Sequence, residues 1–79
     1  MFSKEEFGRR MREARERKGV SQTEAGRQVG GKAAMISDIE NGRRTTTVEK
    51  LAVLSEYYGV STDYLLGHAD NPEPPTGGC

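Results

Sequence analysis

The apolar positions of this chain form five short runs with helical spacing, and each run ends beside a glycine. Apolar residues that recur every three to four positions are typical of a helix that packs one face on a core. The sequence therefore predicts an all-α fold of five helices. The expected helices lie at about 4–18, 22–29, 33–41, 47–58 and 62–66. The side chains expected to face the core are Phe7, Met11, Ala14, Val20, Ala25, Ile36, Ile39, Val48, Leu51, Ala52, Leu54 and Tyr58.

Polar residues at the expected helix starts support these boundaries. Ser21 followed three residues later by Glu24 is a capping box, in which each side chain accepts a backbone N–H of the other residue. A Ser or Thr stands in the same place before three of the other helices. The expected N-caps are Ser3, Ser21, Thr46 and Ser61.

Residues 21–42 combine two short helices with a very short connection. Gly30-Gly31 is expected to end the first of these helices, because glycine adopts positive φ without steric cost. Gly26 lies inside the first of these helices, where it costs roughly 1 kcal/mol relative to alanine. We expect the second helix to cross closely over that bare backbone. Two helices joined so tightly predict a helix-turn-helix.

The same stretch resembles the Cro/repressor family of helix-turn-helix domains, the XRE-type or lambda-repressor-like family. The resemblance covers about residues 5–67. It implies a five-helix DNA-binding domain with the helix-turn-helix at its second and third helices. It also implies a transcriptional repressor that binds double-stranded DNA at a palindromic operator as a homodimer. The residues that carry it are Ser21-Gln22-x-Glu24, Gly26, Val29-Gly30, Ile36-Ser37-x-Ile39-Glu40, Gly42, Leu51-x-x-Leu54 and Tyr58-Gly59-Val60-Ser61-x-Asp63-Tyr64-Leu65-Leu66-Gly67.

Charge is distributed unevenly along the 79 residues, although the net charge is zero. Residues 1–44 carry 11 Lys/Arg and 7 Asp/Glu, a net charge of +4, whereas residues 45–79 carry 1 and 5, a net charge of −4. A chain without net charge is unusual for a DNA-binding protein. The uneven distribution of charge is nevertheless compatible with DNA binding, because the positive half contains the helix-turn-helix.

Few residues could perform chemistry. His68 is the one histidine and Cys79 the one cysteine, so no metal-ligand cluster or nucleophile–histidine set is expected. We expect a protein that is not an enzyme and needs no cofactor or metal. No apolar run approaches the ~20 residues of a membrane span. The sequence reads as that of a cytoplasmic protein with no membrane partner.

The resemblance implies which residues meet DNA, because in this family the second helix of the motif lies in the major groove. Lys32 and Ser37 are expected to reach bases or phosphates, and Arg43 and Arg44 to contact phosphates. Asp38 is expected either to accept from cytosine or to pair with Arg44 or Lys32. The full set is Gln22, Lys32, Ala33, Ala34, Ser37, Asp38, Asn41, Arg43 and Arg44.

The sequence departs from the family pattern at Ala33 and Ala34, where relatives often carry long polar side chains. Gln22 therefore has no obvious amide partner on the following helix and is expected to contact phosphate. Few side chains on this helix can form hydrogen bonds with base edges, so operator shape is expected to contribute to specificity. A protein-interaction module, or an antitoxin-type partner-binding domain on the same fold, is the alternative.

The resemblance also implies one structural contact. Arg15 and Glu40 match family positions that form a buried ion pair. A dimer contact is expected from the residues themselves, because residues 45–79 carry the −4 excess and should face away from DNA. It is expected at the end of the fourth helix and in the fifth, where apolar surface is offered by Tyr57, Tyr58, Val60, Tyr64 and Leu65.

Composition changes at Ala69, after which the chain is rich in proline, glycine and polar residues. The expected domain is therefore 1–68, and 69–79 is expected to be a disordered tail or linker. In repressors of the family such a linker often leads to a regulatory or dimerising domain, so the chain could be a fragment.

Overall fold

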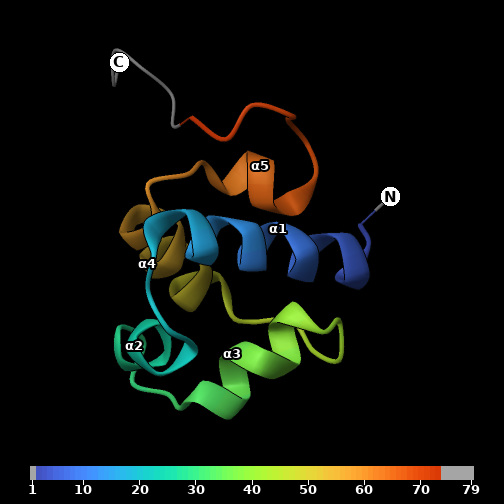
Figure 1. Ribbon diagram of the computed structural model, residues 1–79. Helices are drawn as coiled ribbons and strands as arrows, with labels where there is room; N and C mark the ends of the chain where they lie inside the picture. Colours follow the sequence, from blue (N-terminus) through green and yellow to red (C-terminus); the bar gives the residue numbers. More distant parts are fainter. Residues whose placement is uncertain (1, 74–79) are drawn as a thin grey trace.

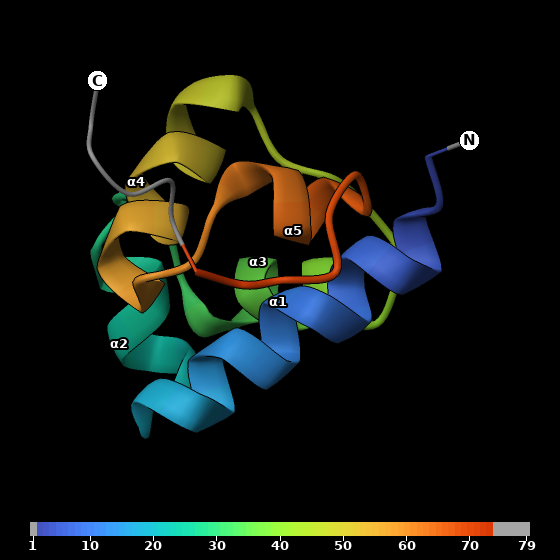
Figure 2. The ribbon, with the colours of Figure 1, turned by 90° about the horizontal axis from the view of Figure 1, so that it is seen from above.

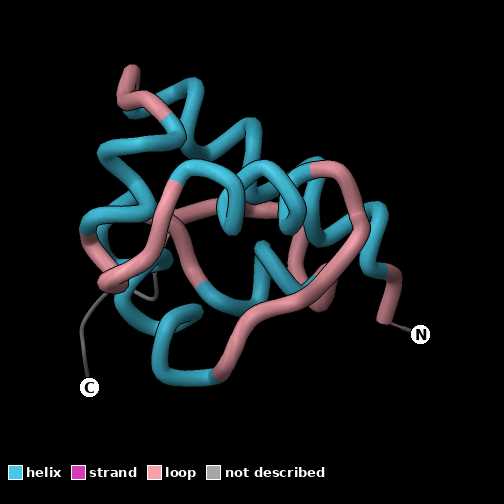
Figure 3. Tube along the Cα trace, turned by 90° about the horizontal axis from the view of Figure 1, so that it is seen from below, coloured by secondary structure: helices cyan, strands magenta, loops and turns pink. Residues whose placement is uncertain are grey.

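A computed structural model of the chain describes residues 2–73. Within these residues the fold is all-α, with helices and loops and no strand (Figure 3). α1 runs through the middle of the molecule, with α5 on one side of it and α2 and α3 on the other (Figure 1). The helices are α1 (Lys4–Lys18), α2 (Gln22–Arg27), α3 (Ala33–Glu40), α4 (Val48–Tyr58) and α5 (Thr62–Leu66).

Hydroxyl caps start four of the five helices. Ser3, Ser21 and Ser61 each accept a backbone N–H three residues later, at 3.0–3.1 Å. At α4 the cap is Thr47, which accepts the Lys50 N–H at 3.1 Å, so the predicted cap at Thr46 is wrong by one residue. The Thr46 hydroxyl is instead buried, without a hydrogen-bond partner among the described residues.

The connection between α2 and α3 is as tight as its glycines predict. A Cβ on Gly26 would lie 2.9 Å from the backbone carbon and oxygen of Lys32, the N-cap of α3, so the expected close crossing is confirmed. Gly30 has φ +68°, a conformation that favours glycine. α2 ends at Arg27, earlier than expected, because residues 28–30 form turns with bonds to carbonyls three residues back.

The core lies between α1 and the other helices. Phe7, Met11 and Ala14 form the buried face of α1, as predicted. α2 buries only Ala25 and Gly26, so it contributes little to the core. The remaining buried hydrophobic residues are Ile36, Ile39, Leu51, Leu54, Tyr58, Val60, Tyr64 and Leu65.

α4 does not bury every residue that its pattern suggested. Its buried stripe is Leu51, Leu54, Ser55 and Tyr58, which have the i, i+3, i+4, i+7 spacing of one helix face. Val48 is 81% exposed and Ala52 is also exposed, so the prediction that they face inward is wrong. These two residues lie on the neighbouring face of the helix, four positions apart.

The chain after α5 folds back along α1 to the start of α5 (Figure 2). The Ser61 N–H donates to the Pro72 carbonyl at 2.8 Å. Arg10 Nη1 donates to the carbonyls of Tyr64 and Ala69, both at 2.8 Å, and its guanidinium lies 4.6 Å from the Tyr64 ring centroid. The predicted boundary at residue 68 is therefore too early, because residues 69–72 pack on the helices. Residues 74–79 of the predicted tail, with Cys79, lie outside the described residues.

Candidate nucleic-acid interface

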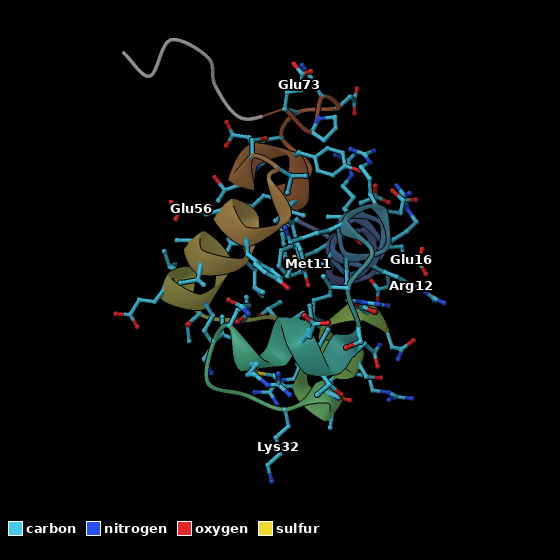
Figure 4. The ribbon with its side chains drawn as sticks, turned by 60° about the vertical axis from the view of Figure 1, so that its left-hand side comes forward. Met11, Arg12, Glu16, Lys32, Glu56 and Glu73 are labelled. Carbon is cyan, nitrogen blue, oxygen red and sulfur yellow. The ribbon has the colours of Figure 1, made fainter. Side chains whose placement is uncertain are left out.

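The outer face of α3 brings together the residues expected to read DNA. Ile36, Ile39 and Glu40 hold the helix against the body of the protein and are buried. Lys32, which precedes the helix, is exposed and points away from the body (Figure 4). On the same exposed side of the helix, Ala34 and Asn41 are exposed, and Ala33, Ser37 and Asp38 are half-buried. The resulting face is continuous and, apart from Lys32, built of short side chains.

Behind that face, Arg15 and Glu40 form the expected ion pair between α1 and α3. Arg15 Nε donates to Glu40 Oε2 at 2.7 Å and Nη2 donates to Oε1 at 3.2 Å, with side chains 13% and 3% exposed. Arg15 Nη1 also donates to the Val20 carbonyl at 2.9 Å. The hydrogen bonds that Arg15 donates to Glu40 raise the pKa of Arg15, so the guanidinium remains charged.

Gln22 has a partner on α3 that the sequence did not reveal. Its Nε2 donates to Glu40 Oε1 at 3.1 Å, so the Glu40 carboxylate ties α1, α2 and α3 together. The sequence offers Gln22 no amide partner at Ala33 or Ala34, and it was therefore expected to contact phosphate alone. The bond to the Glu40 carboxylate corrects this expectation, because Gln22 does have a partner on α3. The held amide fixes the first turn of α2.

The loop after α3 carries two arginines in different environments. Arg43 donates its backbone N–H to the Asp38 carbonyl at 2.9 Å, and its Nη1 lies 3.4 Å from Asp38 Oδ1. Asp38 therefore pairs with Arg43, whereas Arg44 or Lys32 was expected. Arg44 is exposed and makes no ion pair within residues 2–73.

The last turn of α3 uses its polar side chains internally. Asn41 Nδ2 donates to the Ser37 carbonyl at 2.9 Å and to the Ser37 hydroxyl at 3.2 Å. Asn41 is followed by Gly42 at φ +76°, which ends the helix. Asn41 is exposed and Ser37 is half-buried, but the Asn41 amide is turned back along the helix toward Ser37.

Residues 6–66 match the family model described as a helix-turn-helix domain. This chain belongs to the helix-turn-helix domain family. The membership and the five-helix arrangement confirm the XRE-type, lambda-repressor-like fold predicted from the sequence.

Relatives of this helix-turn-helix domain include transcriptional regulators of Bacillus subtilis (strain 168). It is 40% identical over 61 residues to the HTH-type transcriptional regulator ImmR, across 77% of this chain and 48% of ImmR. It is 27% identical over 68 residues to the uncharacterized HTH-type regulator YobD, across 86% of this chain and 61% of YobD. The chain thus spans about half to three fifths of the length of these relatives.

Solved structures share the arrangement. The P22 c2 repressor protein, crystallised with a synthetic operator, matches with TM-score 0.74 and 32% identity, over 80% of this chain and 96% of that one. The restriction-modification controller protein C.AhdI from Aeromonas hydrophila matches with TM-score 0.71 and 26% identity, over 78% and 90%. The DNA-binding domain of BldD matches with TM-score 0.65 and 33% identity, over 78% and 90%.

In this helix-turn-helix domain the residues predicted for dimer contact lie mostly in the core. Tyr58, Val60, Tyr64 and Leu65 are 0–8% exposed, because α4 and α5 pack that face onto α1. The prediction that they offer apolar surface is wrong. Tyr57 is half-buried, with the Lys18 ammonium 4.7 Å from its ring centroid.

Exposed apolar surface is found instead where the N-terminal end of α1 meets α4 and α5, and we call this region the α1–α4–α5 groove. Its volume is about 390 Å³. Phe2, 44% exposed, and Val48, 81% exposed, form part of its wall. The residues around it are Phe2, Phe7, Thr45, Thr46, Val48, Leu51, Ala52, Thr62 and Leu66.

Most arginines of α1 already have acidic partners. Arg9 pairs with Glu6 and with Glu13 (2.7 Å), and Arg12 pairs with Glu16 at 3.2 Å. Hydrogen bonds from Arg9, and then from Arg10, lower the pKa of Glu6. The cations that lack an ion pair within residues 2–73 include Lys32 and Arg44, which border α3.

Other kinds of site find no support in this part of the chain. Residues 2–73 hold no group of three or more potential metal-ligand side chains. None of the helices described here is both long and apolar enough to cross a bilayer. His68 is exposed. The relatives named above are transcriptional regulators, which agrees with a non-enzymatic role.

Proposed function

We propose that this protein is a DNA-binding transcriptional repressor that reads a palindromic operator as a homodimer. The observation that carries the proposal is the exposed face of α3, with Lys32 at its start and Arg44 just beyond its end, on a helix held rigidly from behind by Glu40. A helix presented in this way fits the major groove of B-DNA. The family membership and the likeness to an operator-bound repressor support it. A cytoplasmic location accords with this role.

In this proposal each part of the interface has its own task. Lys32 donates to base acceptors or phosphates, and Ala33 and Ala34 offer methyl groups to thymine. Ser37, Asp38 and Asn41 lie along the groove floor. Gln22 and the backbone N–H groups of the first turn of α2 meet the phosphate backbone, with the Gln22 side chain oriented by Glu40. Arg43 and Arg44 grip phosphates beyond α3.

Homodimer contact is proposed through the α1–α4–α5 groove, which replaces the buried residues expected from the sequence. Val48 and Phe2 expose apolar surface there, whereas Tyr58 and Leu65 are unavailable. Pairing of a surface with itself about a twofold axis gives the symmetry that a palindromic operator requires.

A binding assay tests the DNA-binding role. Fluorescence polarisation of a labelled random duplex at low salt should show association that weakens steeply as salt increases. The variant Lys32→Ala combined with Arg44→Ala should bind more weakly, while Arg9→Ala, which removes an exposed α1 cation already paired with Glu6 and Glu13, should bind like the parent. Absence of binding by the folded parent protein would contradict a DNA-binding role.

The alternative, a protein-interaction module on the same fold, has one observation in its favour. Ala33 and Ala34 leave the centre of the α3 face without long hydrogen-bonding side chains. Such a module would leave the random duplex unbound, so the same assay separates the two functions.

A further inference from the structure

The loop that follows α3 contains three consecutive threonines directly after two arginines, and the structure treats the three hydroxyls differently. Thr47 caps α4, because its Oγ1 accepts the Lys50 N–H at 3.1 Å. The Thr46 Oγ1 is buried. Thr45 is exposed and its hydroxyl makes no hydrogen bond within residues 2–73. One of the three hydroxyls is therefore free to react at the surface.

The backbone around Thr45 is also accessible. Residues 44–47 have neither helical nor turn structure, and no backbone hydrogen bond involves residues 44–46 in this part of the chain. Arg44 immediately precedes Thr45 and is exposed, and Arg43 stands one residue earlier. An exposed, extended basic segment of this kind is complementary in charge to an acidic substrate groove.

We propose that the Thr45 hydroxyl is a phosphorylation site that weakens DNA binding by the loop. A Ser/Thr protein kinase would transfer the γ-phosphoryl group of a nucleoside triphosphate to Thr45 Oγ1. The hydroxyl proton passes to the kinase base, the P–O bond to the leaving group breaks, and a threonine phosphate ester and a nucleoside diphosphate result. The proposal rests on the proposed role of Arg43 and Arg44 in gripping DNA phosphates.

The physical consequence follows from charge. A phosphothreonine carries about −1.5 to −2 charge at pH 7 and pairs strongly with guanidinium groups. Placed beside Arg44 and Arg43, it would occupy the groups that otherwise meet DNA and would repel the DNA backbone. The logarithm of duplex affinity falls linearly with the logarithm of salt concentration, and we call the steepness of this line the salt slope. If both arginines cease to bind DNA phosphates, the salt slope falls by roughly 1.8, which is about a 60-fold decrease of duplex affinity at 0.1 M salt.

The test treats the whole chain with an arginine-directed Ser/Thr kinase and Mg·ATP, and locates phosphate by fragment mass. Thr45 should be modified, Thr45→Val should remain unmodified, and Thr46→Val, which alters a buried hydroxyl, should be modified like the parent. Phosphate found only at other positions, or none incorporated, would overturn the assignment.

Duplex binding by the modified protein completes the test. Because Thr45 also borders the α1–α4–α5 groove, a short random duplex that holds a single protein isolates the effect on the loop. The modified parent should bind tens-fold more weakly at 0.1 M salt, with an unchanged thermal melt. Equal affinity before and after modification would refute the proposal that phosphorylation of Thr45 weakens DNA binding, and would leave the proposed function standing. Failure of the unmodified protein to bind would refute the proposed function as well.

Discussion

Arg15 of α1 and Glu40 of α3 are joined by two charge-assisted hydrogen bonds, of 2.7 and 3.2 Å, across 25 residues of sequence. Gln22 of α2 donates to the same carboxylate. The Glu40 side chain is only 3% exposed, so its charge depends on these donors for solvation. This contact connects the stability of the domain to the orientation of α3.

Replacement of Glu40 by alanine should therefore destabilise the domain strongly. It would leave the Arg15 cation half-buried without its partner, at a cost of about 3–5 kcal/mol. A domain of this size has a comparable total stability, so much of the protein should be unfolded at 25 °C. Circular dichroism melts would measure the loss. As a matched control, Glu16→Ala breaks an exposed ion pair with Arg12 and should cost less than about 1 kcal/mol. An unchanged melt for Glu40→Ala would show that the pair does not stabilise the domain.

Arg10→Ala should loosen the segment after α5. The Arg10 side chain, 12% exposed, donates to the carbonyls of Tyr64 and Ala69 and packs on the Tyr64 ring. Its removal should cost about 1.5–3 kcal/mol, because hydrogen bonds to a charged donor are lost. Deletion of residues 69–79 should have a similar effect, and the exposed Arg12→Ala should be nearly neutral. Hydrogen exchange at the Ser61 N–H, bonded to Pro72, would report the loosening directly. If that amide is as protected in Arg10→Ala as in the parent protein, Arg10 does not hold the segment after α5 in place.

Alkaline pH should destabilise the domain through Tyr58. Burial, and then the nearby Glu40 charge, raise the pKa of its phenol. A pKa raised in the folded state contributes stability that is complete below the unfolded value of about 10 and is lost as pH rises above it. Denaturant titrations across about pH 9 to 11 should show this loss. Tyr58→Phe keeps the packed ring and should lose less stability over that range. Identical pH profiles for the two proteins would exclude Tyr58 as the source.

The sequence predicted the helices well where local chemistry decided them. Ser21 and Gly30 mark their boundaries through hydrogen bonding and backbone conformation, which depend on a few adjacent residues. Gly26 signalled a close crossing correctly. The equivalent signal at Gly8 was missed, although an added Cβ there would lie 2.3 Å from the Ile39 carbonyl oxygen of α3.

Which apolar residues reach the surface could not be predicted from the sequence. Tyr64 and Leu65 look like surface on a five-residue helix, yet the fold presses them against α1. Val48 fits an apolar period but lies on the exposed edge of α4. These outcomes depend on how helices far apart in sequence are placed, and the same holds for the Gln22–Glu40 bond.

Arg43 and Arg44 should act on phosphates. Replacement of either by alanine should weaken binding about equally across duplex sequences and lower the salt slope by roughly one. Polarisation titrations at several salt concentrations, on a specific and a random duplex, would measure both quantities. Asp38→Asn should leave the Arg44 effect unchanged, since Asp38 pairs with Arg43. A loss confined to the specific site would indicate base reading.

The preferred operator should be an inverted repeat. One α3 face with short side chains reads only a few base pairs, and pairing of two copies doubles the readout. The two half-sites should lie about one helical turn, ~34 Å, apart. Selection from a random duplex library, followed by footprinting, would reveal the symmetry and the spacing.

Variants on two surfaces separate base reading from pairing. Lys32→Ala and Ala34→Gln change side chains on the exposed α3 face and should alter the preferred half-site while the symmetry remains. Val48→Asp places a charge in the apolar α1–α4–α5 groove, so it should weaken binding to the full repeat and leave binding to a single half-site unchanged. Arg9→Ala serves again as the control. Because a protein that binds alone gains nothing from a second half-site, selection that returned one non-symmetric half-site would refute the dimer. A Val48→Asp variant that bound the full repeat like the parent would place the contact on another surface.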